Sequence, residues 1–266
     1  MIIVGERINS SSKLVRVAID RRDASYIARL ARAQRDAGAD YIDVNAGIFT
    51  SDEPGRLAWL VSTVQMETDA RLSLDTANGE ALRSALVENK NGKPLINSIT
   101  AQTERFRSVL PLIKEFDASV VALCMDDGGL PATADERADI AGKLIEKLTG
   151  AGVKPEDIFL DPLVCPIGTD PRACVIVLET IKKIRKRWPG VRIVCGVSNI
   201  SYGLPARSLI NSTFLAAAII AGLDCAILDP LDGAVLRTIY AAEALAGADI
   251  NCDEYIKKYR ESGLPE

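Results

Sequence analysis

Small polar side chains stand at the ends of most apolar runs in this sequence. They are Glu6, Arg7, Asn9, Asp43, Asn45, Asp75, Asn97, Ser98, Met125, Asp126, Asp161, Ser198, Asn199 and Asp229, with Met125 the one apolar member. Carboxylates and carboxamides dominate, and together they supply paired hydrogen-bond acceptors and donors. A pocket lined by such groups suits a flat polar heterocycle, whose edge carries both N–H groups and carbonyl oxygens.

The absence of histidine restricts the chemistry that these residues can perform. The chain has no His at all, which excludes a Ser-His-Asp triad, a His general base and any His-containing metal site. No Lys stands at the end of an apolar run, so Schiff-base chemistry is disfavoured. Proton handling must therefore come from carboxylates, amides, water or the substrate.

A magnesium site is the alternative use of the carboxylates. Asp43, Asp75, Asp161 and Asp229 have the oxygen ligands that Mg²⁺ prefers. The acidic stretch DPLDGA after Leu228 lacks the Gly-rich or basic character of a phosphate site. We therefore expect no metal.

Eight short apolar runs alternate with eight longer amphipathic runs, and these elements must position the polar residues. The predicted strands are 2–5, 41–47, 72–76, 94–100, 119–125, 157–162, 191–199 and 225–230. The predicted helices are 26–37, 53–67, 78–88, 104–116, 134–150, 171–187, 206–221 and 233–246, before a charged tail at 253–260. Continuous apolar strands with helical crossovers indicate an α/β fold with a parallel sheet. The count of eight, and the lack of GxGxxG after the first strand, favour a (β/α)8 barrel over an open doubly wound sheet.

The composition is that of one ordinary globular domain. Its 266 residues are 48% hydrophobic and 26% charged, with a formal net charge of −4, so we expect one domain over 1–266 and no nucleic-acid partner. The six cysteines form no CxxC pair, which favours reduced thiols in a cytoplasmic protein. The start MIIVGERIN has no basic n-region, and the longest apolar helix face, 214–223, is too short to span a membrane.

A ring of polar strand ends points to one pocket, because the carboxyl ends of barrel strands meet at one mouth. A single Asp or Asn after a strand is more often a helix cap or a turn residue. That alternative applies to Asp229, which precedes Pro230, to Asn78, and to Asn199 as an Asx-turn residue. Capping explains the whole ring less easily, since most members end a strand and do not immediately precede a helix. A pterin is one ring that such a pocket would suit.

Several longer motifs extend this pattern over almost the whole chain. They are GERIN (5–9), DVNAG (43–47), LDTAN (74–78), LINS (95–98), LDPL (160–163), GVSNIS (196–201) and RSLINSTFLAAA (207–218). In these motifs the chain resembles the methyltetrahydrofolate:corrinoid protein methyltransferases, which are pterin-binding TIM barrels of corrinoid iron–sulfur protein and glycine-betaine-type systems. The resemblance implies transfer of the N5-methyl group of methyltetrahydrofolate to cobalt(I) of a corrinoid by an SN2 reaction.

The resemblance also implies roles for particular residues. Asp75, Asn97 and Asp161 would grip the pterin edge, Gly196 and Ser198 would line its face, and Arg207 would make a polar contact near the mouth. Asn199 would hydrogen-bond the N5 region, and with Asp75 and Asp161 it forms the expected catalytic set. Further lining residues would be Glu6, Asn9, Asp43, Asn45, Ser98, Met125 and Tyr202.

The role of Asn199 is open in one respect. Either its amide donates directly to N5, or it positions a water or carboxylate that does. A tertiary amine is a poor leaving group, so one of these must support N5 as the C–N bond breaks. Tyr202 stands where the family pattern suggests a smaller polar residue, and Thr100 stands where it suggests Asn; we expect both at the pocket rim, where they would affect the choice of corrinoid partner.

The implied partners are a corrinoid protein that docks over the barrel mouth, supplying cobalamin, and a second copy of the chain in a homodimer. Two alternatives are weighed against methyl transfer. A dihydropteroate synthase must bind a pterin pyrophosphate, yet Arg7 and Arg207 are the only clear basic residues at strand ends. If the chain is a non-catalytic pterin-binding barrel, replacing Asn199 should leave every measurable activity unchanged.

Overall fold

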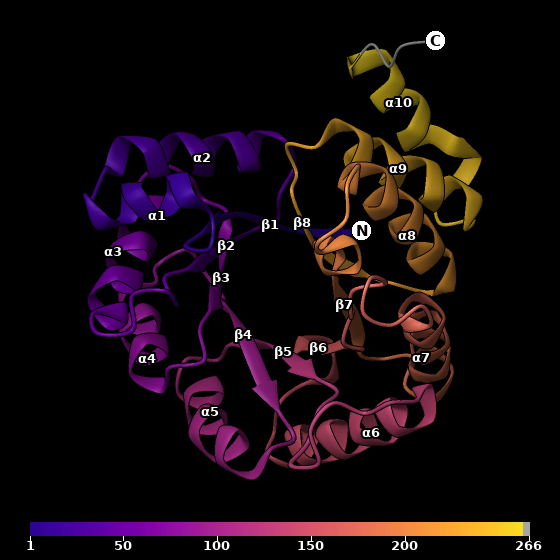
Figure 1. Cartoon of the computed structure of the whole chain (residues 1–266), viewed down its shortest axis with the longest axis horizontal. Coiled ribbons are helices and arrows are strands. Elements are labelled where there is room, and N and C mark those ends of the chain that lie inside the picture. Colours follow the sequence, from indigo (N-terminus) through magenta and orange to yellow (C-terminus); the bar gives the residue numbers. More distant parts are fainter. Residues whose placement is uncertain (263–266) are drawn as a thin grey trace.

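Eight parallel strands close into a barrel in the computed structural model, which describes residues 1–262. Each strand pairs with its neighbours in chain order, and β8 returns to β1 (Figure 1). The strands are β1 (Ile2–Asn9), β2 (Tyr41–Asn45), β3 (Arg71–Asp75), β4 (Leu95–Thr100), β5 (Ser119–Leu123), β6 (Ile158–Asp161), β7 (Arg192–Gly196) and β8 (Cys225–Leu228). The predicted α/β fold of (β/α)8 type is confirmed, while the predicted domain end at residue 266 lies outside the described residues.

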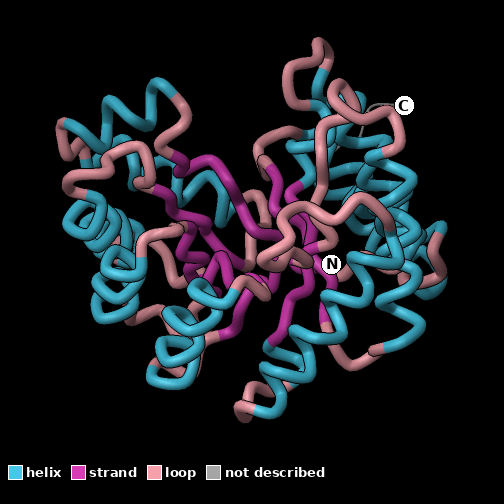
Figure 2. Tube along the Cα trace, turned by 60° about the horizontal axis from the view of Figure 1, so that its bottom comes forward, coloured by secondary structure: helices cyan, strands magenta, loops and turns pink. Residues whose placement is uncertain are grey.

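Helices form an outer ring around these strands (Figures 1 and 2). They are α1 (Lys13–Asp20), α2 (Ala24–Asp36), α3 (Glu53–Gln65), α4 (Gly79–Glu88), α5 (Thr103–Glu115), α6 (Ala134–Gly150), α7 (Ala173–Arg187), α8 (Arg207–Ala221), α9 (Gly233–Leu245) and α10 (Asp253–Ser262), with 3-10 turns η1 (Pro155–Asp157), η2 (Val197–Ser201) and η3 (Ile250–Cys252). Asn78 caps α4, because its side-chain oxygen accepts from the backbone N–H groups of Glu80 and Ala81.

Two apolar layers hold the barrel together. The larger layer lies between the strands and the helices and includes Ile42, Leu72 and Leu144, all fully buried. A smaller cluster is made by one residue from each of seven strands: Val4, Tyr41, Leu95, Val121, Phe159, Val194 and Cys225. Most of these lie in the first half of their strands, so the amino-terminal part of the barrel is closed by apolar packing. The polar residues are left to the carboxyl-terminal end.

Three local features differ from the sequence-based expectation. The loop expected before the first long helix contains α1, whose buried Val15, Ala18 and Ile19 follow helical spacing; the flanking serines and the charged residues concealed this short pattern. Strand β7 ends at Gly196, and Asn199 lies in the 3-10 turn η2 instead of a strand. The charged tail is the amphipathic helix α10.

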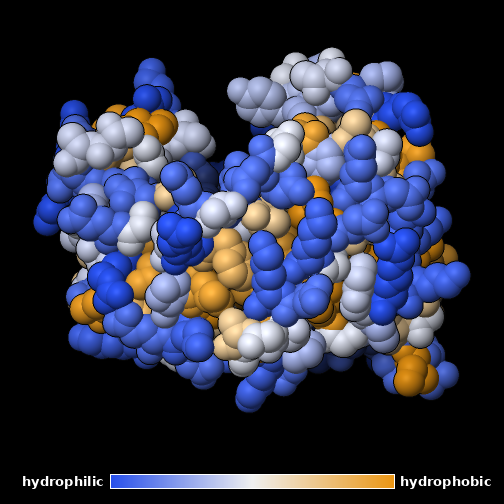
Figure 3. All heavy atoms as spheres, turned by 90° about the horizontal axis from the view of Figure 1, so that it is seen from below, coloured by the Kyte–Doolittle hydropathy of each residue, from blue (hydrophilic) through white to orange (hydrophobic). Residues whose placement is uncertain are grey.

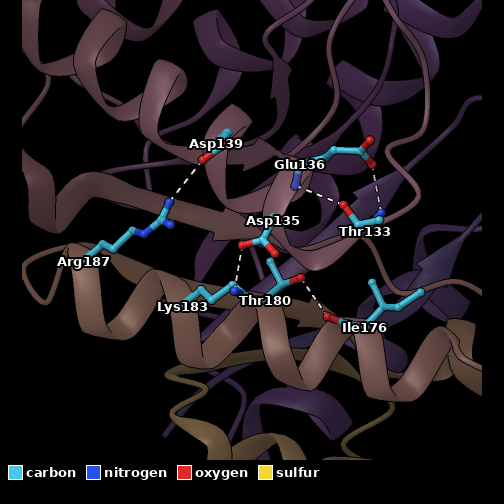
Figure 4. A network of polar contacts seen from close by, with 8 residues as sticks. All are labelled: Thr133, Asp135, Glu136, Asp139, Ile176, Thr180, Lys183 and Arg187. Carbon is cyan, nitrogen blue, oxygen red and sulfur yellow. Dashed lines mark hydrogen bonds and ion pairs between the residues drawn. The ribbon is translucent and has the colours of Figure 1, made fainter.

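The outer ring is also stabilised by polar contacts between adjacent helices. Figure 4 shows α6 and α7 joined by Lys183 to Asp135 at 2.7 Å and by Arg187 to Asp139 at 3.1 Å. The surface in Figure 3 is mostly hydrophilic, with apolar side chains in separate patches. Within residues 1–262, no helix combines the length and apolar character that crossing a membrane requires.

Candidate active site

Strand register brings four of the predicted residues to one level of the barrel. Asn9 pairs with Asn45, Asn45 with Asp75, and Asp75 with Asn97, each pair on adjacent strands. The side-chain nitrogen of Asn45 donates to Asp75 Oδ2 at 3.0 Å and to the Asp75 carbonyl at 3.2 Å. Asn45 therefore fixes Asp75. The four residues Asn9, Asn45, Asp75 and Asn97 form an arc across β1 to β4.

Asp43 supports this arc from within strand β2. It is 2% exposed and accepts hydrogen bonds from Ser73 Oγ at 2.6 Å and from Asn97 Nδ2 at 3.3 Å. Burial, followed by the charge of Asp75, raises the pKa of Asp43 well above its usual value. Asp43 thus orients the Asn97 side chain through this hydrogen bond. Because Asp43 is almost fully buried, it does not line an open surface.

Asp75 and Asp161 are carboxyls poised to change charge slightly below neutral pH. Burial is the main cause that raises the pKa of Asp75 to about 6; the hydrogen bond from Asn45 and the charge of Arg105 oppose it. Burial likewise raises the pKa of Asp161 to about 6, against the backbone hydrogen bond from Leu163 at 2.7 Å. Both are therefore carboxylates at neutral pH, able to accept from N–H groups of a ligand.

A cavity of about 570 Å³ opens beside the ends of β1, β7 and β8. Its lining includes Glu6, Arg7, Asn9, Ser198, Asn199, Tyr202, Arg207 and Asp229. This volume falls within the range of small-molecule sites. The cavity thus collects six of the residues proposed for the pterin site, namely Glu6, Asn9, Ser198, Asn199, Tyr202 and Arg207, whereas Asp75, Asn97 and Asp161 lie outside its lining.

The turn η2 carries Asn199 and is held from two directions. Ser198 Oγ donates to Glu6 Oε2 at 3.1 Å. The guanidinium of Arg207 donates to the Ser198 carbonyl at 2.7 Å and to Ser201 Oγ at 3.0 Å. The Asn199 side chain is exposed and makes no hydrogen bond to residues 1–262, so its amide is available to a ligand.

Several predicted residues have other roles. Arg7 forms an ion pair with Asp229 at 2.9 Å. Asp126 points to a separate cavity, where its carboxylate accepts from the Gly128 backbone and lies 3.8 Å from Lys143. The expectation that Thr100 lies at the rim is wrong: it is 4% exposed and donates to Gln102, whereas Tyr202 is 70% exposed.

Ser98 and Met125 contribute backbone groups to this end of the barrel. The Ser98 carbonyl accepts from Arg105, and the Met125 carbonyl accepts from the N–H of Ala101. Both residues are half-buried, and neither lines the cavity that holds Asn199. Their side chains stay proposed lining residues.

Arg105 is a site-supporting residue that sequence reasoning missed. From α5 it donates to the Ser98 carbonyl at 2.6 Å, the Thr76 carbonyl at 2.8 Å and the Ala77 carbonyl at 2.7 Å. It therefore joins the segment that follows Asp75 to Ser98 within β4. An Arg in the first turns of a charged helix carries no sequence signal for such a role. In the part of the chain that the structure describes, no three His, Cys, Asp or Glu residues gather as a metal site.

Comparison with known proteins identifies relatives over the whole barrel. The family model for pterin binding enzymes matches residues 5–229. The methylcorrinoid:tetrahydrofolate methyltransferase of Eubacterium limosum is 33% identical, over 99% of this chain and 98% of the relative. The methionine synthase of Mycobacterium tuberculosis is 32% identical over 86% of this chain, which corresponds to 20% of that protein. The solved dihydropteroate synthase of Xanthomonas albilineans shares the fold, with a TM-score of 0.72, 17% identity, and 94% and 93% of the two chains covered.

Proposed function

The chain belongs to the pterin-binding enzyme family, and on that premise we propose that it is a methyltransferase that moves the N5-methyl group between methyltetrahydrofolate and the cobalt of a corrinoid on a separate protein. The similarity to the Eubacterium limosum methyltransferase runs end to end and supports this reaction. The likeness to dihydropteroate synthases, at 17% identity, supports only the shared barrel.

The observation that carries the proposal is the uncommitted amide of Asn199 at a barrel mouth that also carries the strand-end carboxylates of Asp75 and Asp161. Asn199 lines the open cavity, and Asp75 and Asp161 end strands of the same barrel mouth. Such a set combines acceptors for a pterin's N–H groups with a neutral donor for its reacting nitrogen. No histidine is present to serve instead.

The pterin edge is proposed to bind through Asp75, Asn97 and Asp161. At neutral pH the two carboxylates accept from pterin N–H groups, and Asn97 contributes its carboxamide. The bond from Asn45 to Asp75 and the bond from Asn97 to Asp43 fix these side chains before the ligand arrives. Such pre-organisation lowers the entropy cost of binding.

Asn199 is the residue proposed to act at N5. As the C–N bond breaks, negative charge develops on N5, and a hydrogen bond from the amide stabilises it more in the transition state than in the ground state. Gly196 and Ser198 are proposed to border the ring face, with Arg207 holding the turn. The corrinoid, brought by its own protein, supplies the cobalt that accepts or donates the methyl group.

Dihydropteroate synthase activity is less well supported, because the cavity's cations are already engaged. Arg7 and Arg207 are the two basic residues in the cavity lining; Arg7 pairs with Asp229, and Arg207 donates to Ser198 and Ser201. A pyrophosphate would need unpaired cations or free backbone N–H groups at this position.

Assembly and location are proposed from the sequence. We expect a homodimer in the cytoplasm, with residues 1–266 forming one pterin-binding unit and a corrinoid protein docking over the mouth. The six cysteines are all free thiols, in keeping with a reducing compartment. Light scattering on the purified chain, alone and mixed with a corrinoid protein, tests the assembly.

Mixing the purified chain with methyltetrahydrofolate and cob(I)alamin tests the reaction. We expect the cob(I)alamin absorbance to be replaced by that of methylcob(III)alamin, and the Asn199→Ala variant to be slower by about 10²- to 10³-fold while binding of the folate changes little. An absence of conversion by the wild-type chain would refute methyl transfer. Condensation of a pterin pyrophosphate with p-aminobenzoate would establish the alternative.

A further inference from the structure

Glu6 is a carboxyl with no role of its own in the proposed reaction, and it lines the cavity that Asn199 also lines. It comes from β1, and its Oε2 accepts from Ser198 Oγ at 3.1 Å, across 192 positions of sequence. Ser198 immediately precedes Asn199, and all three residues line the same cavity. The Glu6–Ser198 bond is thus a direct link between the first strand and the turn that carries the Asn199 amide.

The turn is also held by Ser201 Oγ, which donates to the Ser198 carbonyl at 3.3 Å, and by the Ile167 N–H, which donates to the Ile200 carbonyl at 3.0 Å. Ser198 is fixed at its carbonyl by Arg207 and at its hydroxyl by Glu6. The bond from Arg207 anchors the turn through the Ser198 carbonyl and does not involve Glu6. The anchor to Glu6 depends on the charge of a carboxyl, because an ionised carboxylate only accepts and makes the stronger bond, whereas a protonated one is a neutral partner.

The surroundings of Glu6 place its change of charge near neutral pH. Burial raises the pKa of Glu6 to about 7; the hydrogen bond from Ser198 lowers it, the charge of Asp229 raises it, and Arg207 and Arg7 lower it. Asp43 on β2 is a further acidic neighbour. The charge of Glu6 raises the pKa of Asp43, because two carboxylates repel one another. These groups, from β1, β2, α8 and the segment after β8, are the charges that Glu6 faces.

We propose that Glu6 is a positioning residue for Asn199 that acts through Ser198, and that its ionised form holds the Asn199 amide in the reactive position. The inference rests on the proposed function, because it assigns Glu6 a part in the same methyl transfer. Deprotonation of Glu6 strengthens the bond to Ser198, fixes the turn and raises the transfer rate. Protonation loosens the turn without removing Asn199.

Glu6→Gln separates charge from shape, because the carboxamide keeps the size of the side chain and its ability to accept from Ser198. We expect wild type and Glu6→Gln to transfer the methyl group at similar rates at about pH 6, and wild type to be about fivefold to tenfold faster at about pH 8. The difference should lie in kcat, with KM for methyltetrahydrofolate little changed. Ser198→Ala removes the bond at every pH, so it should be at least as slow as Glu6→Gln at about pH 8, and the double variant should be no slower than Ser198→Ala.

A second measurement keeps this inference separate from the proposed function. In ¹⁵N-labelled wild-type protein, the side-chain amide resonances of Asn199, assigned by their loss in Asn199→Ala, should shift with pH around the pKa of Glu6. The shift should vanish in Glu6→Gln and in Ser198→Ala. The role of Glu6 is overturned, even if methyl transfer occurs, by either of two results. One is that the Asn199 amide resonances do not change with pH in wild type, and the other is that they still shift with pH in Ser198→Ala. If no methyl transfer occurs while the resonances shift, the proposed reaction fails and the Glu6–Ser198 link stands.

Discussion

The side-chain nitrogen of Asn199 lies so close to Gly196 that a Cβ placed on Gly196 would be 2.9 Å from it. Real Cβ atoms do not occupy such contacts, so any side chain at 196 must move either the Asn199 amide or the turn. A side chain at 196 would therefore displace the Asn199 amide from the position that it holds in this structure. The backbone at this position is extended, with φ of −74°, so glycine's conformational freedom is not required here.

Gly196→Ala should displace the Asn199 amide without unfolding the barrel. We expect the methyl-transfer rate to fall by about 10-fold or more, towards the loss of Asn199→Ala, which removes a donor worth roughly 2.7–4 kcal/mol. Rates with cob(I)alamin and the melting temperature of each variant measure this. Gly150→Ala is the control, since a Cβ there meets nothing within 4 Å. A Gly196→Ala enzyme as fast as wild type would show that the position of Asn199 is unimportant.

Asp161→Asn should weaken pterin binding, because a neutral carboxamide accepts less strongly than a carboxylate while keeping its shape. We expect the dissociation constant at neutral pH to rise about tenfold. In wild type, affinity should decline as the pH falls below about 6, because Asp161 and Asp75, whose pKa values are each raised to about 6, become protonated there. Titration calorimetry across this pH range measures both effects. Asp126→Asn, in the separate cavity, should bind as wild type does, and equal losses in both variants would contradict the assignment.

Arg105→Met should destabilise the protein and loosen the backbone beside Asp75 and Asn97, which are proposed to bind the pterin edge. The guanidinium of Arg105 donates to three backbone carbonyls, and their loss should lower the free energy of unfolding by about 2–3 kcal/mol. Chemical denaturation compares this variant with Arg107→Met, an exposed neighbour on the same helix. Equal stability of the two variants would mean that the carbonyls of Thr76, Ala77 and Ser98 are satisfied equally well by water.

Glu6→Gln should become more stable relative to wild type as the pH rises. The unfolded chain releases the Glu6 proton near the ordinary pKa of 4.5, while the folded protein keeps it up to about 7. Wild-type stability therefore falls between these pH values, and the uncharged variant escapes that loss. Each pKa unit corresponds to about 1.4 kcal/mol, so the gain between about pH 4 and pH 8 reaches at most about 3 kcal/mol. Unfolding free energies at several pH values measure it, and a stability difference that does not vary with pH would contradict the raised pKa.

The barrel and the set of polar residues near its mouth could be predicted from the amino-acid sequence alone. Alternating apolar and amphipathic runs are local signals, so they reveal eight strand–helix units and the polar residues at or near the end of most strands. The lack of histidine likewise directs proton chemistry to carboxylates and amides. The short α1 was missed because its pattern occupies only eight residues.

Which of these residues contact one another depends on the packing of the whole chain. Register pairs Asn45 with Asp75, and closure of the barrel brings Glu6 to Ser198. The same long-range packing sends Asp126 to another cavity and turns Arg105 towards the backbone of the loop after β3 and of strand β4. Local periodicity specifies where a side chain stands on its own element. The stagger between neighbouring strands, set by packing across the whole chain, specifies what it faces.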